Sequence, residues 1–319
     1  MQSSGASSIV VVGAGVSGLS CSLALAMGGH RVEIWARATP PNTTSDLAAA
    51  VWHPYLTGPS DKVAVWAGVS YRRFVDLLDV PAAGVAMREI YEFRRVPAPL
   101  PDWADQVSDL EVLDPGALAP GYLHGLRFAA PVVDTRRYLP YLMDELRARG
   151  VAFVQRDLDS LALALDAADV VVNCTGLSAG PLVGDERLVP IRGQGLWVEN
   201  PGIDQVLLDE DDPAGITYVI PRGDQCVLGG SADAGRDDLA VDPDERDAVL
   251  ARCVALAPAL AGARVVRTVV GLRPGRDAVR LEAEHPRPGK TVVHDYGHGG
   301  AGITLSWGCA QEVRALVER

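Results

Sequence analysis

The clearest hydrophobic pattern lies near the start of the chain, where a continuous apolar run over residues 9–12 is followed by glycines. A short apolar run of this kind indicates a strand that is buried on both faces. Apolar residues then recur at helical spacing over residues 19–27, and Gly28-Gly29 marks the end of that helix. Residues 31–35 predict another strand, so the chain begins with the strand, helix and strand of a parallel α/β unit.

The rest of the chain carries two further kinds of pattern. Residues 134–149 predict a capped amphipathic helix, and two apolar runs after it predict buried strands that return to the first unit. Residues 203–232 instead alternate between apolar and polar positions, which predicts short antiparallel strands over residues 206–208, 216–220 and 226–228. The other predicted elements are helices over residues 62–78, 243–260 and 306–317 and strands over residues 87–96, 151–155, 168–174, 265–270 and 291–294.

These patterns predict an α/β protein with a doubly wound, Rossmann-like nucleotide-binding domain. Because the chain loses its strand–helix rhythm after the first unit, we expect a second domain to be inserted there, an α+β substrate domain with an antiparallel sheet. The predicted nucleotide-binding domain is discontinuous and consists of residues 1–61, 134–190 and 271–319. The predicted substrate domain consists of residues 62–133 and 191–270.

Glycines in the pattern Gly-x-Gly-x-x-Gly occupy residues 13–18, between the first strand and the first helix. In this setting they allow a tight turn, the close approach of a pyrophosphate, and close packing of helix on strand. A purely structural glycine turn is the alternative. About 20 residues further on, such units usually carry an acid for the ribose hydroxyls. This chain has Arg37 there, which suits the phosphate of an NADP site or the pyrophosphate of another cofactor.

A second glycine-rich stretch lies close to the C-terminus, between a short extended run and a helical pattern. Residues 297–302 contain four glycines, which would let a planar ligand approach the backbone. Backbone N–H groups at such a helix start favour an anion or an electron-rich ring. We therefore expect this loop to complete the site that the first glycine loop begins.

Composition and charge exclude several classes of protein. The net charge of −12, with no basic run, disfavours nucleic acid or anionic lipid as a partner. No apolar run is long enough to span a membrane, and residues 1–8 lack the pattern of a secretion signal. The five cysteines show no CxxC spacing, so we expect no metal centre and no disulfide framework, and a cytoplasmic location.

In this order and spacing, the motifs resemble those of the D-amino acid oxidase family of flavoproteins. The most specific parts are the sequence His-Gly-Gly-x-Gly-x-Thr at residues 298–304 and Gly-Leu-Arg-Pro at residues 271–274. The matching segments span nearly the whole chain: residues 12–19, 43–56, 172–176, 218–221, 229–230, 271–274, 280–282 and 295–308.

The resemblance implies noncovalently bound FAD and a defined set of site residues. Arg273 would pair with the substrate carboxylate, the Tyr218 hydroxyl would also reach that carboxylate, and the Gly300 carbonyl would accept from the amine. The implied cofactor-binding residues are Gly13, Ala14, Gly15, Val16, Ser17, Gly18, Arg37, Thr43, Thr44, Ser45, Ala49, Ala50, Val51, Leu158, Thr175, Gly176, Arg273, Gly299, Gly300, Ala301, Gly302, Ile303 and Thr304.

The implied reaction is the oxidative deamination of neutral D-amino acids to 2-oxo acids, ammonia and hydrogen peroxide. Whether basic D-amino acids are also substrates is left open. Hydride would pass from the α-carbon to flavin N5, so no acid or base of tuned pKa is needed. A guanidinium suits a carboxylate because it binds it with two parallel hydrogen bonds. The alternatives are a D-aspartate oxidase, a glycine- or sarcosine-type amine oxidase, and an FAD-binding module without turnover. The partners would be a D-amino acid and O2, and a homodimer is left open.

Some positions depart from the family pattern. Glu210, Asp211 and Asp212 form an acidic run that we expect beside the site entrance, where it would repel D-aspartate and D-glutamate. A D-aspartate oxidase would be expected to carry arginines where this chain has Asp211 and Ala232. His53 is predicted to be structural rather than catalytic. If Arg273 did not bind the carboxylate, Arg222 or Arg276 would be the alternatives.

Overall fold

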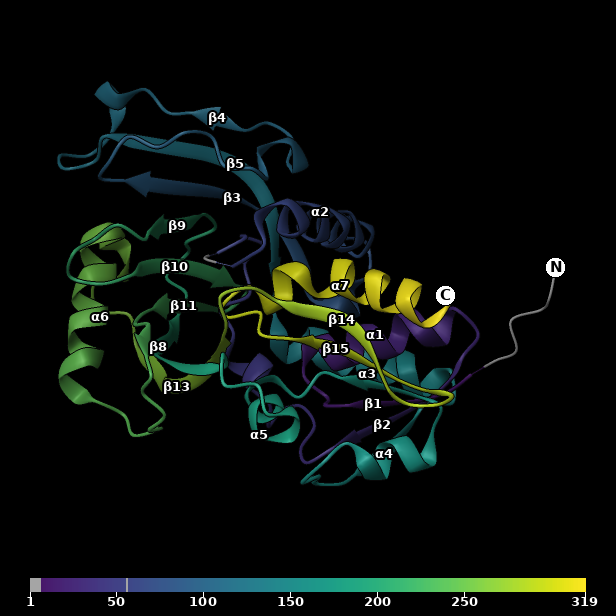
Figure 1. Cartoon of the computed structure of the whole chain (residues 1–319). Coiled ribbons are helices and arrows are strands. Elements are labelled where there is room, and N and C mark those ends of the chain that lie inside the picture. Colours follow the sequence, from purple (N-terminus) through teal and green to yellow (C-terminus); the bar gives the residue numbers. More distant parts are fainter. Residues whose placement is uncertain (1–6, 56) are drawn as a thin grey trace.

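Two β-sheets organise the chain in the computed structural model, which describes residues 7–55 and 57–319 (Figure 1). The first sheet has six strands in the order β14-β15-β7-β1-β2-β6, and all neighbours except β14 and β15 run parallel. Its strands are β1 (Ser8–Val12), β2 (Arg31–Ala36), β6 (Ala152–Gln155), β7 (Val170–Asn173), β14 (Arg280–Arg287) and β15 (Lys290–Tyr296).

Both faces of the first sheet are covered, as a doubly wound sheet requires. Ile9 and Val11 of β1 pack into the core formed with α1 (Val16–Met27), α3 (Thr135–Ala148) and α7 (Gly302–Val317). Val10 and Val12 point the other way and pack near α4 (Ala162–Ala167). The continuous apolar run that predicted a strand buried on both faces is therefore explained by helices on both sides.

The second sheet has nine strands and is mostly antiparallel. Eight follow the order β12-β8-β11-β10-β9-β3-β5-β4, and β13 pairs with β8. One face is covered by α6 (Pro243–Leu256), and in Figure 1 β3, β4 and β5 form an arm beyond the rest of the sheet. The strands are β3 (Val85–Arg94), β4 (Glu111–Val112), β5 (His124–Val133), β8 (Val189–Glu199), β9 (Val206–Asp209), β10 (Thr217–Arg222), β11 (Gln225–Gly229), β12 (Asp233–Ala234) and β13 (Val265–Gly275).

The remaining helices connect these two layers. α2 (Ser60–Asp76) packs against α7, and the short α5 (Ala179–Val183) follows β7. In the described parts of the chain, no helix is long and apolar enough to cross a membrane. Single turns of 3-10 helix occur at Thr44–Leu47, Pro81–Ala83, Ala104–Gln106, Pro115–Ala117, Gly176–Ser178 and Pro258–Leu260.

Three predicted element ends differ from the structure by four residues or more. α6 stops at Leu256, not at residue 260, because the residue before Pro258 is held in a non-helical conformation. β13 continues to Gly275, since residues 265–275 pair with β8, so Arg273 lies on a strand rather than in a turn after it. α7 begins at Gly302, four residues earlier than the apolar pattern indicated, with Ala301 as its N-cap.

The α/β fold class is confirmed, whereas the domain boundaries stay a prediction. The first sheet is built from residues 8–36, 152–173 and 280–296, and the second from residues 85–133 and 189–275. These ranges interleave along the chain in the way that the inserted domain requires.

Candidate active site

A cavity of about 770 Å³ receives walls from both sheets and from the loops between them. The first glycine loop lies at its wall together with β2, and Tyr218 of β10 and Arg273 of β13 come from the second sheet. Residues 298–300 and the first turn of α7 also reach this wall. The two glycine loops thus border one cavity, as the sequence predicted.

The turn into α1 lies at the cavity wall and packs closely against the chain that follows β7. Gly13 has a φ of +110°, and a Cβ at this position would lie 2.4 Å from the carbonyl oxygen of Cys174. The backbone N–H of Val16, the first residue of α1, donates to Ser45 Oγ at 2.9 Å, which fixes the loop at residues 43–45 against the helix start. The first turn of α1 carries no acidic residue, so the positive end of the helix dipole is open to an anion.

Two arginines border the same end of the cavity. Arg37 lies at the wall where the sequence placed it. Arg156 was not predicted; its guanidinium stacks 4.2 Å above the Trp35 ring, and that indole donates to Glu33 Oε2 at 3.1 Å. No local signal marks Arg156, since its role depends on β6 lying beside β2.

Most of the predicted cofactor residues line this cavity. Gly18 and Ala301 do not: Gly18 packs against the Gly13 carbonyl, and Ala301 is buried as the N-cap of α7.

The Thr304 hydroxyl accepts from the His53 backbone N–H at 3.2 Å, which ties α7 to the segment before α2. The predicted residues at the wall are Gly13, Ala14, Gly15, Val16, Ser17, Arg37, Thr43, Thr44, Ser45, Ala49, Ala50, Val51, Leu158, Thr175, Gly176, Tyr218, Arg273, Gly299, Gly300, Gly302, Ile303 and Thr304.

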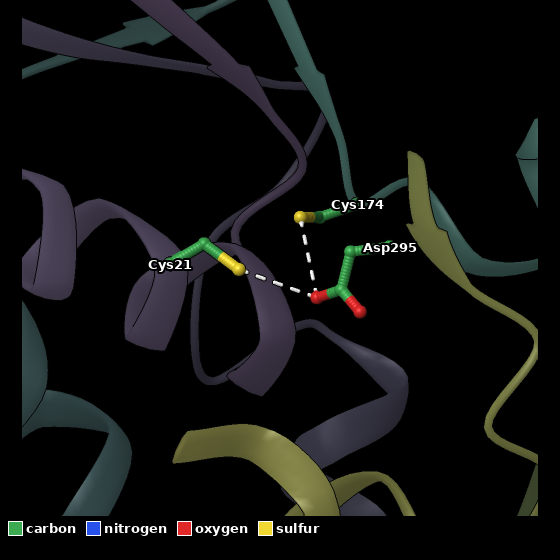
Figure 2. Close-up of side chains that lie close together, drawn as sticks. All are labelled: Cys21, Cys174 and Asp295. Carbon is green, nitrogen blue, oxygen red and sulfur yellow. Dashed lines mark hydrogen bonds between the residues drawn. The ribbon is translucent and has the colours of Figure 1, made fainter. Parts of the chain in front are cut away.

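Asp295 is a buried carboxylate at the cavity wall, held from two sides (Figure 2). Cys21 Sγ donates to Asp295 Oδ2 at 3.2 Å, and Cys174 Sγ lies 3.9 Å from the same oxygen. Burial raises the pKa of both thiols, so they stay protonated and available as donors. His298 Nε2 lies 3.1 Å from Asp295 Oδ1, which gives this histidine a structural role beside the glycine loop. These hydrogen bonds account for the cluster, and the absence of a metal centre stays a prediction.

Arg273 is held beside Tyr218 in the part of the cavity nearest the second sheet. Its Nη1 donates to the Ser231 carbonyl at 2.9 Å, and no carboxylate in residues 7–55 or 57–319 forms an ion pair with it. A Cβ at Gly193 would lie 2.2 Å from the guanidinium, and one at Gly229 would lie 1.7 Å from the Tyr218 ring. Both side chains therefore occupy space that only glycine on the neighbouring strands leaves free.

The two alternative arginines are already engaged elsewhere. Arg276 Nε donates to Asp185 Oδ2 at 3.0 Å. Arg222 donates to the Ala48 carbonyl at 3.1 Å and packs over the Trp197 ring. Neither lies at the cavity wall, so Arg273 is the better placed of the three for a ligand carboxylate.

Tyr55 lies at the same wall and was not predicted as a site residue. Burial and the charge of Glu210 raise its pKa to about 12, although Arg273 acts in the opposite direction. Burial also raises the pKa of Tyr218, against the positive charge of Arg273. Both phenols are therefore protonated near neutral pH, and each can donate one hydrogen bond to a bound anion.

The acidic run is only partly as predicted. Asp211 accepts from Arg94 Nη1 at 3.2 Å, and Asp212 accepts from Arg95 Nη2 at 3.0 Å, so both carboxylates are neutralised. Neither lies at the cavity wall, and the expectation that three carboxylates repel acidic substrates is wrong for these two. Glu210 alone faces the cavity.

His53 connects Glu210 to a buried carboxylate on β3. His53 Nε2 lies 3.2 Å from Glu92 Oε2, and His53 Nδ1 lies 3.6 Å from Glu210 Oε1. Burial acts to lower the pKa of His53, but the charge of Glu210 and the hydrogen bond with Glu92 raise it. Burial likewise acts to raise the pKa of Glu92, but His53 and Arg94 lower it to about 2.

This shift makes stability depend on pH in a defined window. Because the pKa of Glu92 is lower in the folded state, its ionised carboxylate adds to the free energy of unfolding above about pH 4.5. This stabilisation is lost as the pH falls toward 2. The free energy of unfolding of the parent protein should therefore exceed that of Glu92→Gln at neutral pH, and the difference should narrow over that window. Urea titrations across this pH range test it, with Glu111→Gln, an exposed partner of Arg127, as the control.

Comparison with known proteins defines the class. The sequence model of the DAO family, described as FAD dependent oxidoreductase, matches residues 8–316. The chain belongs to this family; it is an FAD-dependent oxidoreductase, and its cofactor is FAD. The close glycine turn, the first turn of α1 without an acidic residue and the residues at the cavity wall fit a dinucleotide of this kind.

Two relatives make the comparison more specific. The chain is 48% identical over 308 residues to a D-amino-acid oxidase of Rubrobacter xylanophilus, covering 96% of this chain and 94% of that protein. It is 41% identical over 310 residues to a D-amino-acid oxidase of Streptomyces coelicolor, covering 97% and 96%. Among solved structures, glycine oxidase from Geobacillus kaustophilus superposes with a TM-score of 0.79 at 19% identity, covering 98% and 95%, which shows a shared fold.

Proposed function

We propose that this protein is a D-amino acid oxidase that converts neutral D-amino acids to 2-oxo acids, ammonia and hydrogen peroxide. The observation that carries the proposal is Arg273, a cavity-lining guanidinium with no carboxylate partner in the described chain, beside the Tyr218 phenol. The full-length similarity to two D-amino-acid oxidases supports the substrate class.

The residues of the chain bind and orient the amino acid. Arg273 pairs with the α-carboxylate, and the Tyr218 hydroxyl adds a second donor to the same group. The carbonyl of Gly300, in the loop that borders the cavity, accepts from the α-amine. These contacts hold two substituents of the α-carbon, the carboxylate and the amine, and the α-hydrogen of a D-amino acid must then point toward the cofactor. Such positioning is a large part of catalysis.

When bound, FAD would supply the acceptor for the α-hydrogen as hydride, and O2 would take up the two electrons to give hydrogen peroxide. The protein then needs no proton-abstracting group at the α-carbon. This agrees with the raised pKa of both cavity tyrosines, which makes them poor bases at neutral pH. The imine product is hydrolysed by water to the 2-oxo acid and ammonia.

Replacing Tyr218 with phenylalanine should have a mild effect. The variant loses one hydrogen bond to the carboxylate, worth roughly 0.5–3 kcal/mol, while Arg273 stays in place. Stopped-flow measurement of flavin reduction should show a raised substrate Kd and a reduction rate that survives. If reduction disappeared while substrate still bound normally, Tyr218 would be acting in the chemistry and the hydride mechanism would be wrong.

A peroxide assay over a substrate panel separates the remaining alternatives. D-Methionine and D-alanine should be oxidised, and their L-forms should not. Preference for D-aspartate would indicate a D-aspartate oxidase, and preference for glycine or sarcosine would indicate an amine oxidase. A protein that carries FAD and turns over no member of the panel would be a binding module.

The setting of the enzyme is also a proposal. The partners would be a free D-amino acid and O2, in a reducing cytoplasm that suits the buried, free thiols of its five cysteines. A homodimer is left open, and gel filtration with light scattering measures it.

A further inference from the structure

Negative charge is in excess at the side of the cavity formed by Glu210. Three carboxylates meet there: Glu92 on β3, Glu210 and Asp211. Two positive groups face them, Arg94 and, when protonated, His53. One negative charge therefore has no partner even with His53 charged, and two have none when His53 is neutral.

Glu210 is the carboxylate left without a firm partner. Arg94 Nε donates to Glu92 at 2.7 Å and Arg94 Nη1 donates to Asp211 at 3.2 Å, so both of those groups are satisfied. Glu210 has only the 3.6 Å approach to His53 Nδ1, which is too long for a good hydrogen bond. Its side chain is 14% exposed, and Glu210 lines the cavity.

Glu210 and Arg273 belong to the same cavity and have opposite charges. Tyr55 lines the same cavity, and the charges of both Glu210 and Arg273 act on its hydroxyl. A ligand whose carboxylate is held at Arg273 therefore shares its cavity with the Glu210 carboxylate. Like-charge repulsion at Glu210 would disfavour an acidic side chain, and a cationic side chain would supply the missing counter-charge.

We propose that Glu210 is the specificity-determining residue of this pocket and binds the ammonium or guanidinium group of a basic D-amino acid. The inference rests on the proposed function and deepens it, because it adds D-lysine, D-ornithine and D-arginine to the neutral substrates. His53, which Glu92 holds through a hydrogen bond, lies 3.6 Å from the Glu210 carboxylate and borders this end of the pocket.

The experiment compares two substrates that differ only at the end of the side chain. D-Norleucine has the carbon chain of D-lysine without the ammonium group, so the ratio of the two kcat/KM values isolates recognition of the charge. In Glu210→Gln the ratio of D-lysine to D-norleucine should fall by at least about tenfold. Glu210→Asp keeps the charge and should retain part of the preference.

Asp212→Asn is the matched control. It removes one negative charge from the same acidic run, but Asp212 is paired with Arg95 and does not line the cavity. Its ratio should equal that of the parent enzyme. An equal fall in Asp212→Asn and Glu210→Gln would mean a general field effect and would overturn the proposal, as would an unchanged ratio in Glu210→Gln.

Measuring the ratio of D-lysine to D-norleucine kcat/KM over a pH series gives a result that a purely structural role of Glu210 would not change. Burial raises the pKa of Glu210, and the negative charges of Glu92 and Asp211 raise it further. The positive charges of His53 and Arg94 act in the opposite direction. The preference for D-lysine should therefore decline as pH falls and Glu210 takes up a proton, and the Glu210→Gln ratio should stay flat over that range. A parallel decline in the variant would contradict the proposal.

The outcomes also separate this inference from the proposed function. If the flavin-loaded enzyme oxidises D-norleucine but not D-lysine, the inference is wrong and the proposed function stands. If it oxidises neither substrate nor any other D-amino acid, the proposed function is wrong and the inference falls with it.

Discussion

Arg273→Ala should give a folded, flavin-containing protein that oxidises D-amino acids about 30-fold to several-thousand-fold less efficiently. A buried, hydrogen-bonded ion pair loses roughly 2–5 kcal/mol when one partner is truncated, and this range of kcat/KM follows from it. The effect should be large because Arg273 lies beside Tyr218, whereas Arg37 and Arg156 border the end of the cavity near α1, so no neighbouring guanidinium replaces it. Steady-state kinetics with D-methionine measures the loss.

Arg267→Ala provides the control on the same strand. Arg267 stacks 3.6 Å from the Trp197 ring and does not line the cavity, so its removal should leave kcat/KM close to that of the parent. If Arg273→Ala turned over D-methionine at the parent rate at low substrate concentration, the carboxylate would have to bind elsewhere.

Gly13→Ala should abolish stable FAD binding and destabilise the fold by roughly 2–6 kcal/mol. Two effects add: a left-handed φ of +110° that an L-residue adopts only with strain, and a Cβ 2.4 Å from the Cys174 carbonyl. Relief of that contact moves the turn away from β7, which deforms the place where a pyrophosphate would lie. Flavin content after gel filtration and a thermal melt measure the two effects.

Gly29→Ala separates strain from steric overlap. Gly29 also has a positive φ, +86°, but nothing lies within 4 Å of the position of its Cβ. The substitution should cost only about 1–2 kcal/mol and leave the flavin bound. Equal flavin loss in both variants would show that global stability, rather than the geometry at Gly13, controls cofactor binding.

The fold was largely predictable because its signals are local. The strand at residues 9–12 and the helix capped by Asp134 can each be recognised from a few neighbouring residues. The extent of β13 could not be read in the same way, since residues 271–275 stay extended through pairing with β8, far away in the sequence. The early start of α7 was missed because Gly302, its first residue, belongs to the glycine-rich stretch and adds nothing to the apolar pattern.

The site residues also differ in whether a local sequence signal marks them. The glycine loops and Arg273 belong to short sequence motifs that indicate a function, and the structure brings them to one cavity. Glu210 was predicted to lie near the site entrance only as a member of an acidic run. Its approach to His53, which Glu92 holds from 39 residues further along the chain, could not be read from the sequence. Arg156 stacks on Trp35 only after β6 has paired with β2. Contacts between distant segments are what a single sequence without an alignment does not reveal.

The most direct test of the central claim is anaerobic mixing of the purified, flavin-containing enzyme with D-methionine and, separately, with L-methionine. We predict that D-methionine bleaches the visible absorption of the bound flavin, that L-methionine does not, and that admitting oxygen restores the colour with release of hydrogen peroxide. Flavin that stays oxidised with every D-amino acid, or that is reduced equally by both enantiomers, would contradict the account.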